Sequence, residues 1–396
     1  GKNYVITQPN TPRHWYNYMY NDEYITFSSQ VGFGEGFAQD NMGRRVPLVM
    51  NRNFFLCEDE YWSLAGLPIN YGYTDYSCTH TAGSTTINLR YNDISSSVRI
   101  FVPNNKMQEI WTISLKNHSN RRREISLIPY AKTDVDSPYK PQGYNIATGD
   151  VYKEKNCVYG FFYQAFNSQR NLPMCGYMSS SQKISGFDTR KTAFVGAYSD
   201  EQRPEAINNN LKCTNSSCFA EKLCFALQND IVLEANEQKT LHFVLGVSFS
   251  KEEIVTPEDK WVQQQFQAME DKYEQRIRQV QIKTPWENFD NLVNGWLPYA
   301  TDMGSRWARV RHNGYRDMSQ DTDCFSVINP SLAWERIKRV LTYQYDNGYA
   351  PRTIIDGVLK DRNFSDNTVW LTFAVYDIVK ELGDITILNE DRKSVV

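Results

Sequence analysis

The sequence predicts a multidomain β + α protein: a large antiparallel β-sandwich, a helical linker, and then helices that suit an α/α barrel or bundle. Short β-type runs separated by turn residues fill the first 250 residues. The period then changes to that of an amphipathic helix, and helical patterns follow to the end. We therefore expect a sandwich over residues 1–253, a linker helix over 254–284 and the start of a helical domain over 285–396.

The β-region is predicted from runs that alternate or carry β-branched and aromatic residues. These runs are Thr85–Leu89, Val98–Val102, Ile110–Leu115, Glu124–Ile128 and Leu241–Ser248. A glycine-rich piece, Val31–Phe37, lacks the Lys-Ser/Thr and the following helix of a phosphate loop, so we interpret it as a tight hairpin.

The linker is predicted to begin at Thr256, a good N-cap, with Pro257 in the first helical position. Apolar residues then repeat at helical spacing up to Ile277.

Further helices are predicted after Trp286. The first runs through Asn288–Tyr299, and the second begins at Asn329-Pro330 and ends at Asn347-Gly348. The third begins near Asp366 and ends at Gly383.

Composition excludes several classes of protein. The net charge of −3 with scattered Lys and Arg argues against nucleic-acid binding, and no apolar run of about 18 residues could span a membrane. The five histidines are far apart, so no metal site is predicted. The eight cysteines form no C-x-x-C pair, and the first residues do not resemble a signal peptide; we expect reduced thiols in a cytoplasmic protein.

The densest polar and aromatic cluster lies between Asn294 and Asp321. Its arginines suit an anion, and its carboxylates, amides and aromatic faces suit a sugar. A helix with a solvated charged face is the alternative. The polar members are Arg306, Arg309, Arg311, Arg316, Asp317, Gln320 and Asp321.

Two carboxylate elements have two interpretations each. Asp317 and Asp321 are four residues apart and would share one helix face with Gln320 alongside, where they could hold a sugar, act as acid and base, or cap the helix. Asp366 either caps the third helix or lies at the mouth of a barrel.

The chain resembles glycoside hydrolase family 94, the inverting β-glucoside phosphorylases. The most specific match is G-Y-R-D-M-S-Q-D at Gly314–Asp321, which is similar to the family's G-F-R-D-x-x-Q-D. Four further segments match in the family's order: Tyr4–Tyr18, Lys183–Asp188, Asn363–Trp370 and Glu381–Leu388.

This resemblance implies an N-terminal β-sandwich, a linker and the first helices of an (α/α)6 barrel, which would be incomplete here. It also implies a cytoplasmic homodimer without metal or cofactor, with a β-glucoside and inorganic phosphate as partners. The reaction would be reversible phosphorolysis of a β-linked glucoside to α-glucose 1-phosphate and a shortened acceptor, an inverting cleavage with phosphate in place of water.

The resemblance also assigns roles to residues. Arg311 and Asp317 match the pair that holds the sugar at the cleaved bond, and Arg306 matches a phosphate-binding arginine, with Arg309 as a substitute. The substrate-binding set is Arg311, Arg316, Asp317, Gln320 and Asp321, and Arg170 lies near a segment that reaches the acceptor.

The family's general acid lies in a later D-W-N-D segment that does not occur up to Val396, so we expect the acid beyond Val396 or on a second polypeptide. Two alternatives stay open. One is a non-catalytic carbohydrate-binding or scaffold protein. The other is an inverting hydrolase with Asp366 as acid and Asp317 or Asp321 as base.

Overall fold

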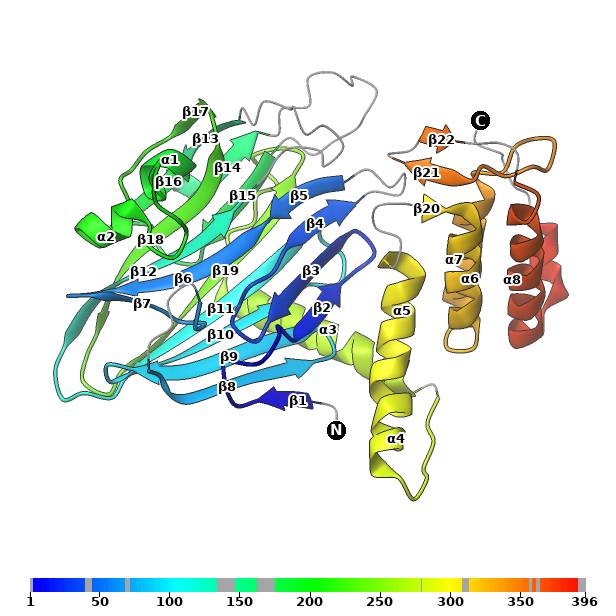
Figure 1. Cartoon of the computed structure of the whole chain (residues 1–396), viewed down its shortest axis with the longest axis horizontal. Helices are drawn as coiled ribbons and strands as arrows, with labels where there is room; N and C mark the ends of the chain where they lie inside the picture. The colour runs from blue at the N-terminus through cyan, green and yellow to red at the C-terminus, as the bar shows by residue number, and fades with distance from the viewer. Residues whose placement is uncertain are drawn as a thin grey trace. The chain divides into compact units, whose positions relative to one another are not determined.

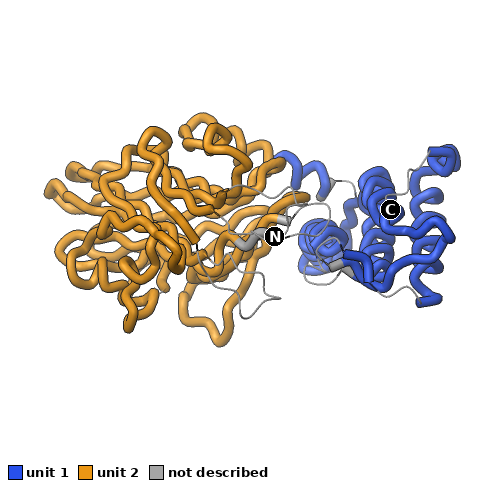
Figure 2. The backbone as a smooth tube through the Cα atoms, turned by 90° about the horizontal axis from the view of Figure 1, so that it is seen from above, with its two compact units in different colours: residues 1–2, 39–45, 270–396 blue, residues 3–38, 46–269 orange. Residues whose placement is uncertain are grey.

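The computed structural model divides the chain into two compact units (Figure 2). The sandwich unit comprises Asn3–Ala38 and Val46–Met269, and the helical unit comprises Glu270–Val396 with two short pieces, 1–2 and 39–45. The structure describes residues 3–39, 45–67, 72–133, 147–161, 175–278, 280–307, 313–355, 358–360 and 364–390.

Two large sheets form the sandwich, and neighbouring strands in both are antiparallel (Figure 1). The ten-stranded sheet has the order β1 (Asn3–Ile6), β8 (Thr74–Thr81), β9 (Ser84–Tyr91), β10 (Ile94–Phe101), β11 (Gln108–Asn117), β19 (Gln238–Ser248), β15 (Cys175–Ser180), β14 (Cys157–Phe161), β13 (Ala147–Tyr152) and β17 (Cys218–Glu221). The five-stranded sheet has the order β16 (Gly186–Arg190), β18 (Leu223–Leu233), β12 (Arg123–Lys132), β6 (Asn51–Cys57) and β7 (Tyr61–Ser63). A four-stranded sheet contains β2 (Tyr16–Tyr20), β3 (Tyr24–Ser29), β4 (Gly36–Gln39) and β5 (Arg45–Val49).

Strand β6 shows how the alternation of side chains builds two apolar layers. Phe54 and Leu56 join the main core between the large sheets, where the ring of Phe54 meets that of Trp111 edge-on at 5.0 Å. Phe55 points to the opposite face and joins a second cluster with Tyr130. Two short helices, α1 (Lys191–Phe194) and α2 (Glu205–Asn210), contribute to this second cluster.

The predicted β-region is confirmed: the five runs correspond to β9, β10, β11, β12 and β19. The glycine-rich piece Val31–Phe37 lies at the β3–β4 hairpin, and Phe33 contacts the rings of His14 and Tyr16. The predicted start of the linker helix is wrong, because α3 spans Asp259–Arg278. The Thr256 hydroxyl donates to the Lys155 carbonyl (3.1 Å) and does not cap the helix.

The helical unit contains α4 (Glu287–Asn291), a π-helical turn (Leu292–Trp296), α5 (Leu297–Trp307), α6 (Tyr315–Ser326), α7 (Pro330–Leu341) and α8 (Asn367–Leu382). Three short strands, β20 (Asn313–Gly314), β21 (Thr353–Ile355) and β22 (Val358–Lys360), form a small sheet. Apolar side chains of α6, α7 and α8 share one core. The fold class is therefore the predicted one, antiparallel sheets followed by helices, while the boundaries at 253 and 284 stay predictions.

The ends of α7 and α8 can be compared with the helix starts and stops that the sequence predicts. Asn329 caps α7 as predicted, accepting from the Leu332 amide at 3.0 Å, and Gly383 ends α8 in the left-handed region. The predicted end of α7 at Asn347-Gly348 is wrong. After Leu341 each of the next three backbone amides donates to the carbonyl of the residue three positions earlier, so the helix ends in a 3₁₀-type turn. The buried Tyr343 joins the core.

All eight cysteines carry free thiols, and only Cys324 is exposed. In the described part of the chain, no helix is long and apolar enough to cross a bilayer.

We expect acid to destabilise the sandwich through His80. Burial lowers the pKa of His80 from 6.5 to about 4. Its Nε2 donates to the Trp15 carbonyl (3.1 Å), and its Nδ1 accepts from the Thr85 hydroxyl (3.0 Å). The unfolded state binds the proton first as pH falls, so up to about 3 kcal/mol of stability should be lost between pH 6.5 and pH 4.

Urea unfolding at pH 7, 6 and 5 checks this expectation. His80→Gln should flatten the pH dependence relative to the wild-type protein, with His118→Gln as a matched histidine control. An unchanged slope in His80→Gln would contradict the role of His80.

Candidate active site

The start of α6 is fixed by the small sheet. Gly314 ends β20 opposite Thr353 of β21, and the buried Tyr315 donates its amide to the Arg352 carbonyl at 3.1 Å. Gly314 is the N-cap, so Asp317 is the third residue of the helix. A Cβ on Gly314 would collide with the Asp317 carboxylate. A larger residue at position 314 would therefore have to displace the carboxylate from the helix N-terminus, where a negative charge is stabilising.

The predicted helical spacing of the carboxylates is confirmed, because Asp317, Gln320 and Asp321 all lie on α6, one turn apart, and all are partly buried. Between them Ser319 and Thr322 are buried. Asp317 thus projects from the first turn, and Gln320 and Asp321 project from the second turn, of a helix whose other face joins the core.

Arg316 pairs with a carboxylate at the start of α8. Its guanidinium Nη1 pairs with Asp366 Oδ2 at 2.8 Å, and both side chains are about half exposed, at 48% and 45%. The interpretation of Asp366 as a side-chain cap of α8 is wrong: it occupies the N-cap position, but its carboxylate makes no capping hydrogen bond. The ion pair instead ties the beginnings of α6 and α8 together. Such an exposed pair contributes at most about 1 kcal/mol.

Arg306 and Asp321 are brought together. They line a pocket of about 40 Å³ together with Ser305, Arg336 and Arg339, so three arginines and one aspartate contribute to its walls. Arg306 also lies over the ring of Trp307, at 4.5 Å. At about 40 Å³ the pocket admits a small group but does not enclose a whole sugar, which could contact only its rim.

Sequence reasoning missed Asp302, which at 2% exposed is the best-buried carboxylate among the described residues of the helical unit. It pairs with Arg276 of α3 and, at 3.0 Å, with Arg336 of α7. Arg336 also lies 4.5 Å over the ring of Phe325. Asp302 precedes Arg306 by one helical turn, so this ion network supports the base of the arginine pocket. Its partners are too distant in sequence for spacing to have revealed it.

Arg311, Arg309 and Arg170 lie outside the described residues. Among the residues that it does describe, no three His, Cys, Asp or Glu side chains cluster as metal ligands.

A carboxyl pair between α6 and α8 gives the helical unit a pH dependence. Partial burial is the largest cause that raises the pKa of Asp323, and the charge and hydrogen bond of Asp377 raise it further. A raised carboxyl pKa means that the native state holds the proton longer, so this pair's contribution to stability is present in acid and lost as pH rises.

We therefore expect Asp323→Asn to raise the melting temperature at pH 7 slightly, by removing the repulsion, and to lose this advantage near pH 4. Thermal denaturation at both pH values measures it, and Asp377→Asn should behave alike. A lower melting temperature at pH 7 for both variants would refute the pairing.

An antiparallel sandwich followed by helices that carry clustered arginines and carboxylates places the chain among proteins that join a β-sandwich to a helical domain. This chain belongs to glycosyl hydrolase family 94. Residues 2–264 match the model described as glycosyl hydrolase 94, supersandwich domain, and residues 272–394 match the glycosyl hydrolase 94 superfamily, catalytic domain.

Similar proteins include solabiose phosphorylase of Paenibacillus borealis, 26% identical over 98% of this chain and 53% of that protein. The 3-O-beta-D-glucopyranosyl-beta-D-glucuronide phosphorylase of the same organism is 28% identical over 98% of this chain and 52% of its own length. The chain thus spans about half the length of these relatives. In fold it is similar to a bacterial glucoamylase complexed with acarbose, with a TM-score of 0.55 and 11% identity over 99% of this chain and 62% of that chain.

Proposed function

We propose that the protein catalyses inverting phosphorolysis of a β-linked glucosyl disaccharide or oligosaccharide, releasing α-glucose 1-phosphate and a shortened acceptor. The family and the phosphorylase relatives support the reaction class. The observation that carries the proposal for this chain is the meeting of Arg306 and Asp321 in a pocket with two further arginines. Phosphate is already an anion and needs no general base, but it needs cations and hydrogen-bond donors around it.

In this proposal Arg306 contacts phosphate, and Arg311 and Asp317 hold the glucosyl unit at the cleaved bond. Arg316, Gln320 and Asp321 complete the substrate contacts, with Arg316 anchored by Asp366. The general acid, which protonates the leaving oxygen, is proposed to follow Val396 in the chain.

Helix α8 supports a continuation of the helical domain. One face packs Leu371, Ala374 and Ile378 into the core, while Val369 and Phe373 are about half exposed on another face. A helix that is apolar on two faces is normally covered on both. We propose that further barrel helices cover the second face, that the enzyme is a homodimer, and that it works in the cytoplasm, which its free thiols suit.

The test is phosphate-dependent release of glucose 1-phosphate by the full-length protein from a panel of β-1,2-, β-1,3- and β-1,4-glucobioses. We expect release from at least one of them, as the α anomer by proton NMR, and none without phosphate. Free glucose released at the same rate without phosphate would replace the proposal by hydrolysis. No release from any substrate would refute it.

A further inference from the structure

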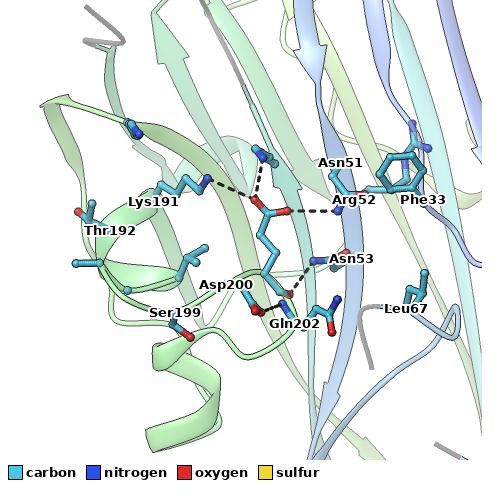
Figure 3. A pocket seen from close by; sticks show the side chains of 16 residues that line it. Phe33, Asn51, Arg52, Asn53, Leu67, Lys191, Thr192, Ser199, Asp200 and Gln202 are labelled. Atoms are coloured by element: carbon cyan, nitrogen blue, oxygen red, sulfur yellow. Dashed lines mark hydrogen bonds and ion pairs between the residues drawn. The ribbon is translucent and has the colours of Figure 1, made fainter. Parts of the chain in front are cut away.

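The sandwich unit contains a pocket of about 620 Å³ whose lining includes lysine, asparagine and carboxylate side chains that the proposed reaction does not use (Figure 3). The size is that of pockets which enclose small organic ligands. Its walls come from β6, the end of β12, α1 and the segment after α1. All its lining residues belong to the sandwich unit, and none belongs to the arginine pocket of the helical unit.

The pocket begins where one face of the five-stranded sheet changes from apolar to polar. Phe55 and Tyr130 on this face are buried against α1. Further along each strand the same face carries Asn53 and Asn51 on β6, two and four residues from Phe55. Lys132 on β12 lies two residues from Tyr130 and opposite Asn51. These polar side chains contact Glu201, so this part of the face is built around a carboxylate and not around an apolar layer.

The Glu201 carboxylate lies at the centre of this polar face. It is approached by Lys132 Nζ at 3.3 Å, by Lys191 Nζ at 3.4 Å and by Asn51 Nδ2 at 3.3 Å. Asn53 Nδ2 donates to the Glu201 carbonyl at 3.1 Å. Figure 3 shows Lys191, Asn51 and Asn53 converging on this region from α1 and β6. Glu201 is 18% exposed at its side chain, so it is accessible from the pocket.

The charges leave a cationic surplus. Lys132, Lys191 and Lys222 line the pocket against two carboxylates, Glu201 and Asp200. Asp200 is already used by its own turn, where it accepts from the amides of the two residues after Glu201. Two ammonium groups therefore share one carboxylate, and each retains N–H donors for a second anion. Phe33 supplies an apolar wall.

We propose that this pocket binds a phosphorylated sugar. The sugar hydroxyls donate to the Glu201 carboxylate, and the phosphate accepts from Lys191 and Lys132. Either half alone explains only part of the pocket: a neutral sugar leaves the surplus cations unused, and inorganic phosphate alone would fill only a small part of the volume of about 620 Å³. This site is separate from the proposed function and does not depend on it.

Calorimetric titration with glucose 6-phosphate tests the site, with glucose and inorganic phosphate as partial ligands. We expect saturable binding of glucose 6-phosphate that is tighter than that of either partial ligand. Lys191→Met should weaken it by about tenfold or more, as expected for loss of a charge-assisted hydrogen bond. Lys239→Met is the matched control, because Lys239 also pairs with one carboxylate, Glu237 at 3.4 Å, but lies on β19 away from the pocket residues.

Glu201→Gln separates the two halves of the ligand. It should reduce the advantage of glucose 6-phosphate over inorganic phosphate while leaving phosphate binding equal or tighter. Urea unfolding verifies that each variant folds, and Lys132→Met replaces Lys191→Met if the latter does not. Asp317→Ala should leave this binding unchanged, which distinguishes it from binding at the proposed active site. Absence of saturable binding, equal binding of glucose, or equal loss in Lys239→Met would overturn the proposal.

Discussion

Replacing Glu109 with alanine is expected to lower the free energy of unfolding by about 3–5 kcal/mol, because it leaves a buried guanidinium without its counter-ion. The side chains of Glu109 and Arg52 are both completely buried, and Arg52 Nη2 lies 3.0 Å from a Glu109 carboxylate oxygen. Tyr24 Oη (3.0 Å) and Trp111 Nε1 (2.6 Å) also donate to this carboxylate. The Arg52 guanidinium also donates to the Phe27 carbonyl at 2.8 Å and to the hydroxyl of Thr26.

Urea unfolding followed by tryptophan fluorescence measures the loss. The matched control is Glu124→Ala, which removes a carboxylate from an exposed pair with Arg122 at 2.8 Å and should change stability by less than about 1 kcal/mol. Comparable losses in the two variants would contradict the argument. Glu109→Leu combined with Arg52→Met should cost less than the sum of the single changes, because neither charge is then left alone.

The same ion pair explains why the segment Val31–Phe37, which we interpreted as a tight hairpin, is rich in glycine. A Cβ on Gly34 would collide with the Phe27 carbonyl, and one on Gly36 would meet Tyr24 Oη at 2.5 Å and Glu109 Oε2 at 2.9 Å. The glycines therefore let the β3–β4 hairpin lie directly on the buried network. The sequence predicts a turn here from composition, but not its packing against a residue on β11, about seventy positions later.

The fold could be predicted because periodicity is a local signal. Alternation along β6 places Phe54 and Leu56 in the core, and an N-cap asparagine with a proline fixes the start of α7. The prediction that failed concerned a residue whose local role is displaced by a partner far away in the sequence. Asp366 stands at a position where the sequence predicts a helix cap, but its carboxylate pairs with Arg316, fifty positions earlier.

The candidate site shows the same division. Helical spacing correctly placed Asp317 and Asp321 on one helix. Asp302 escaped notice, because a single aspartate in T-D-M-G-S-R carries no sign that Arg276 and Arg336 will converge on it. Spacing describes one element at a time, whereas a buried ion network is assembled from several.

Asp317→Ala is expected to reduce kcat/KM of the full-length enzyme by about a hundredfold or more while leaving the fold intact. The proposed role of Asp317 is to accept hydroxyls of the glucosyl unit at the cleaved bond, and charge-assisted contacts that strengthen in the transition state are worth several kcal/mol. The fold should tolerate the change. Asp317 is only partly buried, and an acid in the first turn of a helix contributes about 0.3–1 kcal/mol.

The measurement is initial-rate glucose 1-phosphate release, with the melting temperature recorded alongside. The control is Asp323→Asn, a carboxylate on the same helix that faces Asp377 of α8, which should retain its activity. Gly314→Ala should imitate Asp317→Ala, because the added methyl group would occupy the place of the Asp317 carboxylate. If Asp317→Ala turns over at nearly the wild-type rate, the carboxylate is a helix-capping group and the sugar is held elsewhere.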